Sequence, residues 1–199
     1  MLDKTIPWHS FIMSLEPTGF KEREMNCPGV RVRPYESEKD EIAWAKIETA
    51  VGEFDTVEEA AECHRHYLEY EDELRRRQWF VVDENDEAVA TCTVWWSGED
   101  RIPCIHALSC LPEKQGCGYG RLAAQQAIRS ALEAEQRTIW LETQTWSWKA
   151  VCLYLSLGFV PRRTAVFNET PNDYALSCPL IGEKAGEKVL DRILETAID

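Results

Sequence analysis

Three glycines lie at alternate positions, 116, 118 and 120, in the run QGCGYGRLAAQQAIRSALEA. A strand is expected before this run and a helix within it. Bare backbone amides and a helix N-terminus would then meet at one turn, which is an arrangement that can hold phosphate oxygens. No Gly-Lys-Ser/Thr sequence follows and no βαβ unit begins here, which argues against Walker and Rossmann sites. The remaining alternatives are a phosphate-binding turn and an ordinary tight turn.

A second segment, ETQTWSWKAVCLYLSLGFVP, favours the first alternative. It follows another expected strand and places Ala150 and Tyr154 four residues apart, on one face of a helix that ends at a Gly-Phe pair. Together the two segments resemble the GNAT superfamily of acyl-CoA-dependent N-acetyltransferases. The resemblance extends, less sharply, over residues 30–180. The residues that match the family's Gln/Arg-x-x-Gly-x-Gly/Ala and Ala-x-x-x-Tyr-x-x-x-Gly-Phe signatures are Gln115, Gly118, Gly120, Ala150, Tyr154, Gly158 and Phe159.

The resemblance implies an α+β fold. Its centre would be a mixed, mostly antiparallel, twisted sheet of about six to seven strands, flanked by helices and splayed at the acetyl-CoA site. We expect residues 1–199 to form a single domain of this kind, with residues 1–29 as an N-terminal extension and residues 183–199 as a C-terminal helix.

The resemblance also implies acetyl-CoA as the cosubstrate, with no metal. Residues 115–121 would hold its pyrophosphate by backbone amides, and the backbone of residues 109–111 would pair with the pantetheine arm. The N–H of Cys110 would polarise the thioester carbonyl. Ser147 stands where many relatives carry an Asn that helps hold the pantetheine, and a helix N-cap is its alternative role. The expected cofactor-binding residues are Ser109, Cys110, Leu111, Gln115, Gly116, Cys117, Gly118, Tyr119, Gly120, Arg121, Ser147 and Ala150.

Acetyl transfer to an amine requires a proton acceptor, because an alkylammonium with a pKa of about 10.4 is charged at neutral pH. His106 is the first candidate, since its reference pKa near 6.5 suits a general base. The segment from His106 to Leu108 also resembles the strand of serotonin N-acetyltransferase-type members, where a histidine serves in the proton path. The alternatives are a packed core histidine at position 106 and Glu142, in the next expected strand, as the base.

Tyr154 matches the family residue that assists the departing CoA sulfur, and packing on a helix face is its alternative role. A route through an acyl-cysteine at Cys104 or Cys110 would need an activating partner, and His106 is the only evident one. We therefore expect direct attack of the amine in a ternary complex. A domain of the same fold that senses CoA without turnover, and an enzyme with a longer acyl donor, remain alternatives.

The acceptor is expected to be cationic, because residues 36–87 hold 18 acidic and 6 basic residues. Their alternative interpretation is a solvated helical pair. Glu53 could bind the acceptor's ammonium directly, and Trp95 or Trp146 could face it by cation–π attraction. The acceptor would be a small-molecule amine or a protein amino group. The last helix is expected to pack on the domain, and a homodimer contact is its alternative use.

Periodicity and turn residues place these candidates on a series of expected elements. A Gly at 158 would end the helix of residues 147–157 as a C-cap. Strands are expected at residues 8–15, 29–35, in a hairpin over 79–96, and at 102–111, 138–143, 158–167 and 173–180. Helices are expected at residues 38–51, 56–77, from the glycine run to about 134, and at 147–157 and 183–197.

Length and composition exclude several other classes of protein. A chain of 199 residues with 44% hydrophobic content can form one core, and a net charge of -13 argues against nucleic-acid binding. No apolar run is long enough to span a bilayer, and no signal core is present, so a cytoplasmic protein without a membrane partner is expected. The eight cysteines form no CxxC pair and no zinc-type cluster, so we expect reduced, mostly buried thiols.

Overall fold

The computed structural model describes residues 1–199 and contains seven strands and seven α-helices. The strands are β1 (Ser10–Leu15), β2 (Val30–Pro34), β3 (Gln78–Asp83), β4 (Ala88–Ser97), β5 (Ile102–Cys110), β6 (Ile139–Gln144) and β7 (Val160–Pro161). The helices are α1 (Glu38–Val51), α2 (Val57–Leu68), α3 (Glu71–Arg77), α4 (Tyr119–Ala134), α5 (Trp148–Leu157), α6 (Tyr174–Ala185) and α7 (Glu187–Thr196).

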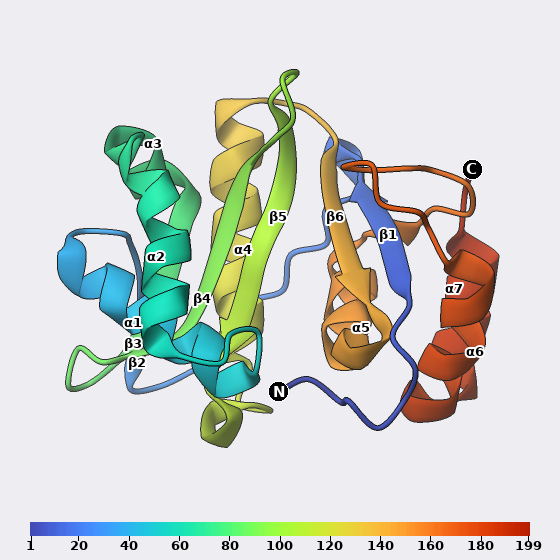
Figure 1. Ribbon diagram of the computed structural model, residues 1–199, viewed down its shortest axis with the longest axis horizontal. Helices are drawn as coiled ribbons and strands as arrows, with labels where there is room; N and C mark the ends of the chain where they lie inside the picture. Colours follow the sequence, from blue (N-terminus) through green and yellow to red (C-terminus); the bar gives the residue numbers. More distant parts are fainter. The chain divides into compact units, whose positions relative to one another are not determined.

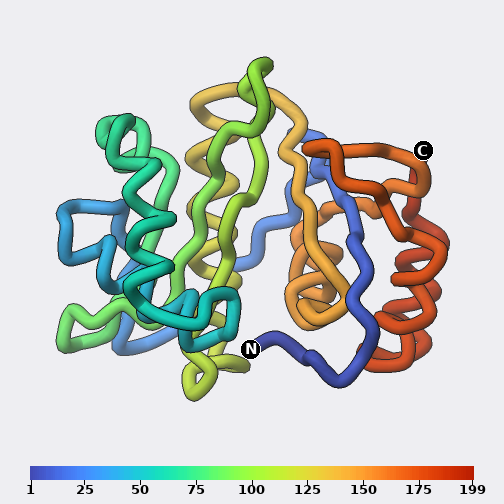
Figure 2. Tube along the Cα trace, in the orientation of Figure 1, coloured from blue at the N-terminus to red at the C-terminus, as the bar shows by residue number.

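The strands form an open, mixed sheet in the order β2-β3-β4-β5-β6-β1-β7. The pairs β2–β3, β3–β4, β1–β6 and β1–β7 are antiparallel, whereas β5 and β6 pair in parallel at Cys104 and Trp140. Figure 2 follows the chain from β4 through a turn at residues 98–101 into β5. This α+β architecture with a mostly antiparallel sheet confirms the expected fold class.

The chain divides into two compact units. The first comprises residue 1 and residues 23–95 and 106–136, and the second comprises residues 2–22, 96–105 and 137–199. Both contribute strands to the sheet, and organisation as a single domain stays a prediction.

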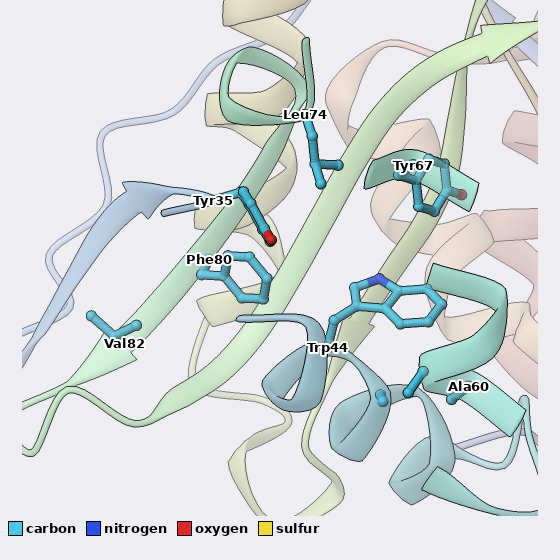
Figure 3. Packing of buried hydrophobic residues seen from close by; sticks show 9 residues of the cluster. Tyr35, Trp44, Ala60, Tyr67, Leu74, Phe80 and Val82 are labelled. Carbon is cyan, nitrogen blue, oxygen red and sulfur yellow. The ribbon is translucent and has the colours of Figure 1, made fainter. Parts of the chain in front are cut away.

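The first unit has helices on both faces of its strands. Figure 1 shows α1 and α2 on one side of β3 and β4, with α4 on the other. Consecutive residues Phe80, Val81 and Val82 of β3 are therefore all 0% exposed. Figure 3 shows Trp44 of α1 and Phe80 of β3 among the side chains of this core. Burial of these large apolar side chains is the main source of stability for the layer.

In the second unit, β1 and β6 pair over six residues and α6 packs against β1, α5 and α7. A smaller apolar cluster contains Ile12 of β1, Cys104 of β5 and Phe167, with Trp140 stacked on the Phe167 ring. Residues 10–15, expected within an N-terminal extension, thus form a strand inside the sheet.

Two expected elements are wrong in part and a third is wrong altogether. Residues 56–77 form two helices, because Tyr70 leaves helical geometry at φ −127° and ψ 47°. The strand expected at 158–167 is limited to Val160–Pro161. The strand expected at 173–180 is instead α6, whose buried residues Ser177, Cys178, Ile181 and Gly182 have helical spacing that extends beyond the expected strand.

The last helix begins at Glu187, because Gly186 at φ 94° separates it from α6. All eight cysteines are free, but only Cys92, Cys104 and Cys178 are buried, so the expectation of mostly buried thiols is wrong. None of the helices is long and apolar enough to cross a membrane.

Candidate active site

The glycine turn at residues 115–121 leads directly into α4. Gly118 is the N-cap residue of α4 and has a left-handed conformation, with φ 88°. No side chain caps this helix end, so the first amides of α4 depend on a partner from outside the helix. Gly116 also has a positive φ, 83°, and a Cβ atom there would meet nothing within 4 Å. The turn therefore has open space at Gly116, whereas a Cβ atom at Gly118 would lie 2.6 Å from Met25 Cε. Backbone amides at a helix N-terminus of this kind suit an anionic group.

Two hydrogen bonds hold the segment around Arg23 against α4. The backbone N–H of Arg23 donates to Gln125 Oε1 at 3.1 Å, and Gln125 Nε2 donates to the Arg23 carbonyl at 2.9 Å. Burial and the positive charge of Arg23 both lower the pKa of Arg121. An anion bound at this helix end would offset the repulsion between the two guanidinium groups.

The strand β5 ends next to this turn. Gln115 Nε2 donates to the Cys110 carbonyl at 3.2 Å, and the Cβ position of Gly120 lies 3.9 Å from Cys110 Cβ. The N–H of Leu111 donates to the Val89 carbonyl at 2.9 Å. Of the three residues expected to pair with pantetheine, Leu111 thus has its amide already engaged.

His106 lies on β5 and contacts Tyr67 of α2. The Tyr67 hydroxyl and His106 Nδ1 form a hydrogen bond, and the two rings are nearly perpendicular with centroids 5.5 Å apart. His106 keeps an exposed surface, while the packing on its other side lowers the pKa of the imidazole below its ordinary value. Neutral His106 can accept a proton at Nε2 in the tautomer that carries its ring hydrogen on Nδ1, and in that tautomer Nδ1–H donates to the Tyr67 oxygen.

Several aromatic rings pack around Tyr67 near its hydrogen bond to His106. Trp95 lies edge-on to Tyr67, with centroids 4.9 Å apart, and it also contacts the exposed ring of Tyr70 at 6.4 Å. His64 also packs edge-on against Tyr67 and hydrogen bonds to Gln78. Figure 3 labels the Tyr67 side chain as part of the buried core cluster.

Glu48 is a buried acid in the last turn of α1. Its residue is 3% exposed, and Ser109 Oγ donates to its Oε2 at 2.9 Å. Burial, opposed by the Ser109 hydrogen bond and assisted by Glu53, raises the pKa of Glu48 to about 8. Glu53 itself is exposed and lies just beyond the end of α1.

The second unit contains the remaining predicted site residues. Tyr154 of α5 is 6% exposed and contacts the Phe159 ring, with centroids 5.6 Å apart. Ala150 is half-buried on the same helix. Ser147 is the N-cap residue of α5, the position given by its alternative role, but its side chain makes no capping hydrogen bond.

Two further candidates of the second unit have defined surroundings. Glu142 is exposed on β6 opposite Ile12. Trp146 Nε1 donates to the Ile6 carbonyl at 2.7 Å, and Lys4 Nζ lies 5.4 Å from its ring centroid. The Trp146 ring thus already has a cation at its face.

Sequence reasoning missed Tyr67, Glu48, Arg23 and Gln125. Tyr67 follows His64 by three residues on the apolar face of α2, which is typical of a core residue and carries no functional signal. Glu48 lies in a helix rich in acids, and only the structure distinguishes its buried carboxyl from the solvated ones. Arg23 and Gln125 lie 102 positions apart, so no local pattern links them.

Comparison with known proteins identifies the class. The family described as "Acetyltransferase (GNAT) family" matches residues 42–159, so the chain belongs to the GNAT acetyltransferase family. No curated protein matches the chain.

Solved structures show the same fold. A GCN5-related N-acetyltransferase from Sphaerobacter thermophilus has a TM-score of 0.62 at 16% identity, covering 77% of this chain and 48% of its own. A GNAT-family acetyltransferase from Colwellia psychrerythraea has a TM-score of 0.58 at 10% identity, covering 78% and 54%. A GCN5-related N-acetyltransferase from Kribbella flavida has a TM-score of 0.52 at 19% identity, covering 77% and 54%. This chain therefore spans about half the length of these structures.

Proposed function

We propose that this chain is an N-acetyltransferase that moves an acetyl group from acetyl-CoA to a primary amine by direct attack in a ternary complex. The observation that carries the proposal is the uncapped N-terminus of α4, which begins at the left-handed Gly118 in a chain of the GNAT family. The backbone amides of residues 115–121 bind the pyrophosphate, and Arg23 and Arg121 add positive charge at the same helix end.

His106 is the proposed general base. Its lowered pKa keeps the imidazole neutral at pH 7, and Tyr67 fixes the ring so that Nε2 receives the proton of the attacking amine. Tyr67 is 5% exposed and packed in the core, so its own position is fixed. Its hydroxyl can therefore hold the His106 ring in one orientation. Glu142, exposed on β6, is the alternative base that His106 variants would reveal.

The thiols of the site favour direct transfer over an acyl-cysteine. Burial raises the pKa of Cys110 to about 11 and that of Cys104 to about 12. Both groups are therefore protonated at neutral pH, and a thiol is a much weaker nucleophile than its thiolate. Double-reciprocal plots of initial rate should intersect. Parallel lines would contradict direct transfer.

The acceptor is proposed to be a cationic small-molecule amine or protein amino group. Glu53 is the candidate for holding its ammonium, and Trp95, which packs edge-on against Tyr67, offers it an aromatic face. Trp146 is retained as a third candidate, although Lys4 lies over its ring. A second copy of the chain is a further candidate partner, which the mass of the protein in solution tests.

The family resemblance supplies the proposed roles in the second unit. Tyr154 would stabilise the departing thiolate through its hydroxyl, while Ser147 and Ala150 would help to hold the pantetheine arm. Tyr154→Phe removes only the hydroxyl, so the ring packing against Phe159 is retained. A loss of kcat without a change in the KM for acetyl-CoA supports the role in leaving-group stabilisation, and an unchanged kcat refutes it.

The test of the proposed function is an amine panel assayed with acetyl-CoA, with release of free CoA thiol and the mass of the product as readouts. The proposal predicts acetylation of at least one primary amine and a lower rate for Tyr154→Phe. Binding of acetyl-CoA without acetylation of any amine would support a domain that senses CoA. Preference for a longer acyl donor would correct the identity of the transferred group.

A further inference from the structure

Glu48 has chemistry that the proposed transfer does not use. Its carboxyl is buried, its Oε2 accepts a hydrogen bond from Ser109, and its Oε1 has no hydrogen-bond partner. With a pKa raised to about 8, the side chain is mostly protonated at pH 7. Ser109, the hydrogen-bond partner of Glu48, is the residue immediately before Cys110 on β5.

The groups around Glu48 favour positive charge. Glu53 lies one turn further along, with its N–H donating to the Glu48 carbonyl at 3.1 Å, and its charge raises the pKa of Glu48. The last turn of α1 has no basic residue, and the C-terminal end of a helix carries partial negative charge. On the packed elements, burial first and then the charge of Glu48 raise the pKa of Cys63 of α2 and of Cys92 of β4.

We propose that Glu48 is a specificity-determining residue for a cationic acceptor: an alkylammonium that binds beside Glu53 drives the Glu48 proton into solvent. The inference rests on the proposed function. The O–H bond of the carboxyl breaks, the proton passes to the buffer, and the carboxylate remains in the field of the ammonium. An uncharged acceptor gains no such attraction, so the buried acid discriminates by charge without touching the acceptor.

The first test requires no acceptor. The carboxyl carbons of the full chain are titrated by ¹³C NMR, with the Glu48 signal assigned from Glu48→Gln. We expect a Glu48 pKa near 8, which Glu53→Gln lowers by removing repulsion. Glu38→Gln is the matched control, because it removes the same charge from the opposite end of α1. A Glu48 signal that titrates near its ordinary value of 4.5, or that Glu53→Gln leaves in place, overturns the proposal.

The second test adds n-butylammonium chloride near neutral pH and compares it with sodium chloride at equal ionic strength. Only butylammonium should move the Glu48 signal towards its carboxylate position. Calorimetry in two buffers of different ionisation enthalpy should then show proton release in the wild-type chain and none in Glu48→Gln. A Glu48 signal that ignores butylammonium, or equal proton release from both chains, overturns the proposal.

The two proposals can fail separately. If the Glu48 signal responds as expected but no amine is acetylated, the proposed function fails and the coupled cation site stands. If amines are acetylated but the Glu48 signal does not change when a cationic amine is added, the proposed function stands and the inference about Glu48 is wrong.

Discussion

At the scale of single residues, the hydrogen bond between Tyr67 and His106 decides which nitrogen can act as the base. His106→Gln should lower kcat/KM about 100-fold, the usual contribution of a positioned general base. It should also abolish an acidic limb of the pH profile. Because the base must be unprotonated, this limb lies where pH falls through the lowered pKa of His106, below 6.5. If the pH profile of His106→Gln keeps its acidic limb, His106 is not the general base, and Glu142 or a water chain takes that role.

The Tyr67→Phe variant tests the orientation of the imidazole. It removes the hydroxyl that pairs with His106 Nδ1 and leaves the ring that packs on Trp95. Both tautomers then become accessible, so kcat should fall about tenfold or less, with little change in the KM for acetyl-CoA. A fall equal to that of His106→Gln would instead mean that the Tyr67 hydroxyl itself carries the proton.

Glu48 also makes a prediction about stability. Its pKa of about 8 in the folded chain exceeds its ordinary value of 4.5, so the native state holds this proton more tightly than the unfolded chain. The associated stability is present below pH 4.5 and is lost as pH rises towards 8, at up to about 1.4 kcal/mol per pH unit. Urea unfolding should show a flatter decline over this range for Glu48→Gln. Equal slopes in the two proteins would contradict the buried neutral acid.

At the scale of elements, two glycine C-caps form a matched pair. Gly52 ends α1 at φ 94° and Gly158 ends α5 at φ 103°, so alanine is strained at both positions. A Cβ at Gly52 meets nothing, whereas one at Gly158 would collide with the Gly19 carbonyl oxygen. Gly52→Ala should therefore cost about 1 kcal/mol of unfolding free energy. Gly158→Ala should cost about 1 to 3 kcal/mol more, and equal losses would contradict the close approach of residue 19.

The elements with strong local signals could be predicted from the sequence. The Thr56 side chain accepts a hydrogen bond from the Glu59 amide at 3.2 Å, as its capping pattern predicts, and Gly158 ends α5 as expected. The strand expected at residues 173–180 is wrong, and Pro179, which is disfavoured inside a helix, hides the local signal for α6. The segment instead forms a helix that buries Ser177 and Ile181 on one face. Local preference is weak where buried contacts from distant segments determine the element.

The site was predictable to the extent that backbone geometry determines it. Glycine is favoured at position 118 because φ is positive there and because a Cβ atom would lie 2.6 Å from Met25 Cε, and this preference leaves a sequence signature. The pairing of Arg33 with Asp40 in the core, and of Glu48 with Ser109, leaves none, since buried and solvated acids look alike in α1. Such pairs bring together side chains from different elements, and only the fold decides which acids lose contact with water.

At the scale of the whole molecule, the net charge of -13 predicts how affinity responds to salt. The Debye length falls from about 10 Å at 0.1 M to about 3 Å at 1 M ionic strength, so attraction of a cation to the acidic segment is screened. The KM of an alkylamine should rise several-fold over this range. An aniline-type amine, uncharged at neutral pH, is the control and should change little. Equal responses of the two amines would contradict electrostatic attraction of the acceptor.

The central claim is that residues 115–121 bind the diphosphate of acetyl-CoA, and calorimetric titration with a matched pair of variants tests it most directly. Asn and Asp both tolerate the positive φ of Gly116, where added side-chain atoms meet open space. The account predicts that the wild-type chain binds acetyl-CoA. It also predicts that Gly116→Asp binds it about tenfold more weakly than Gly116→Asn, a difference of about 1.4 kcal/mol from charge alone. No uptake by the wild-type chain, or equal affinity of the two variants, would contradict it.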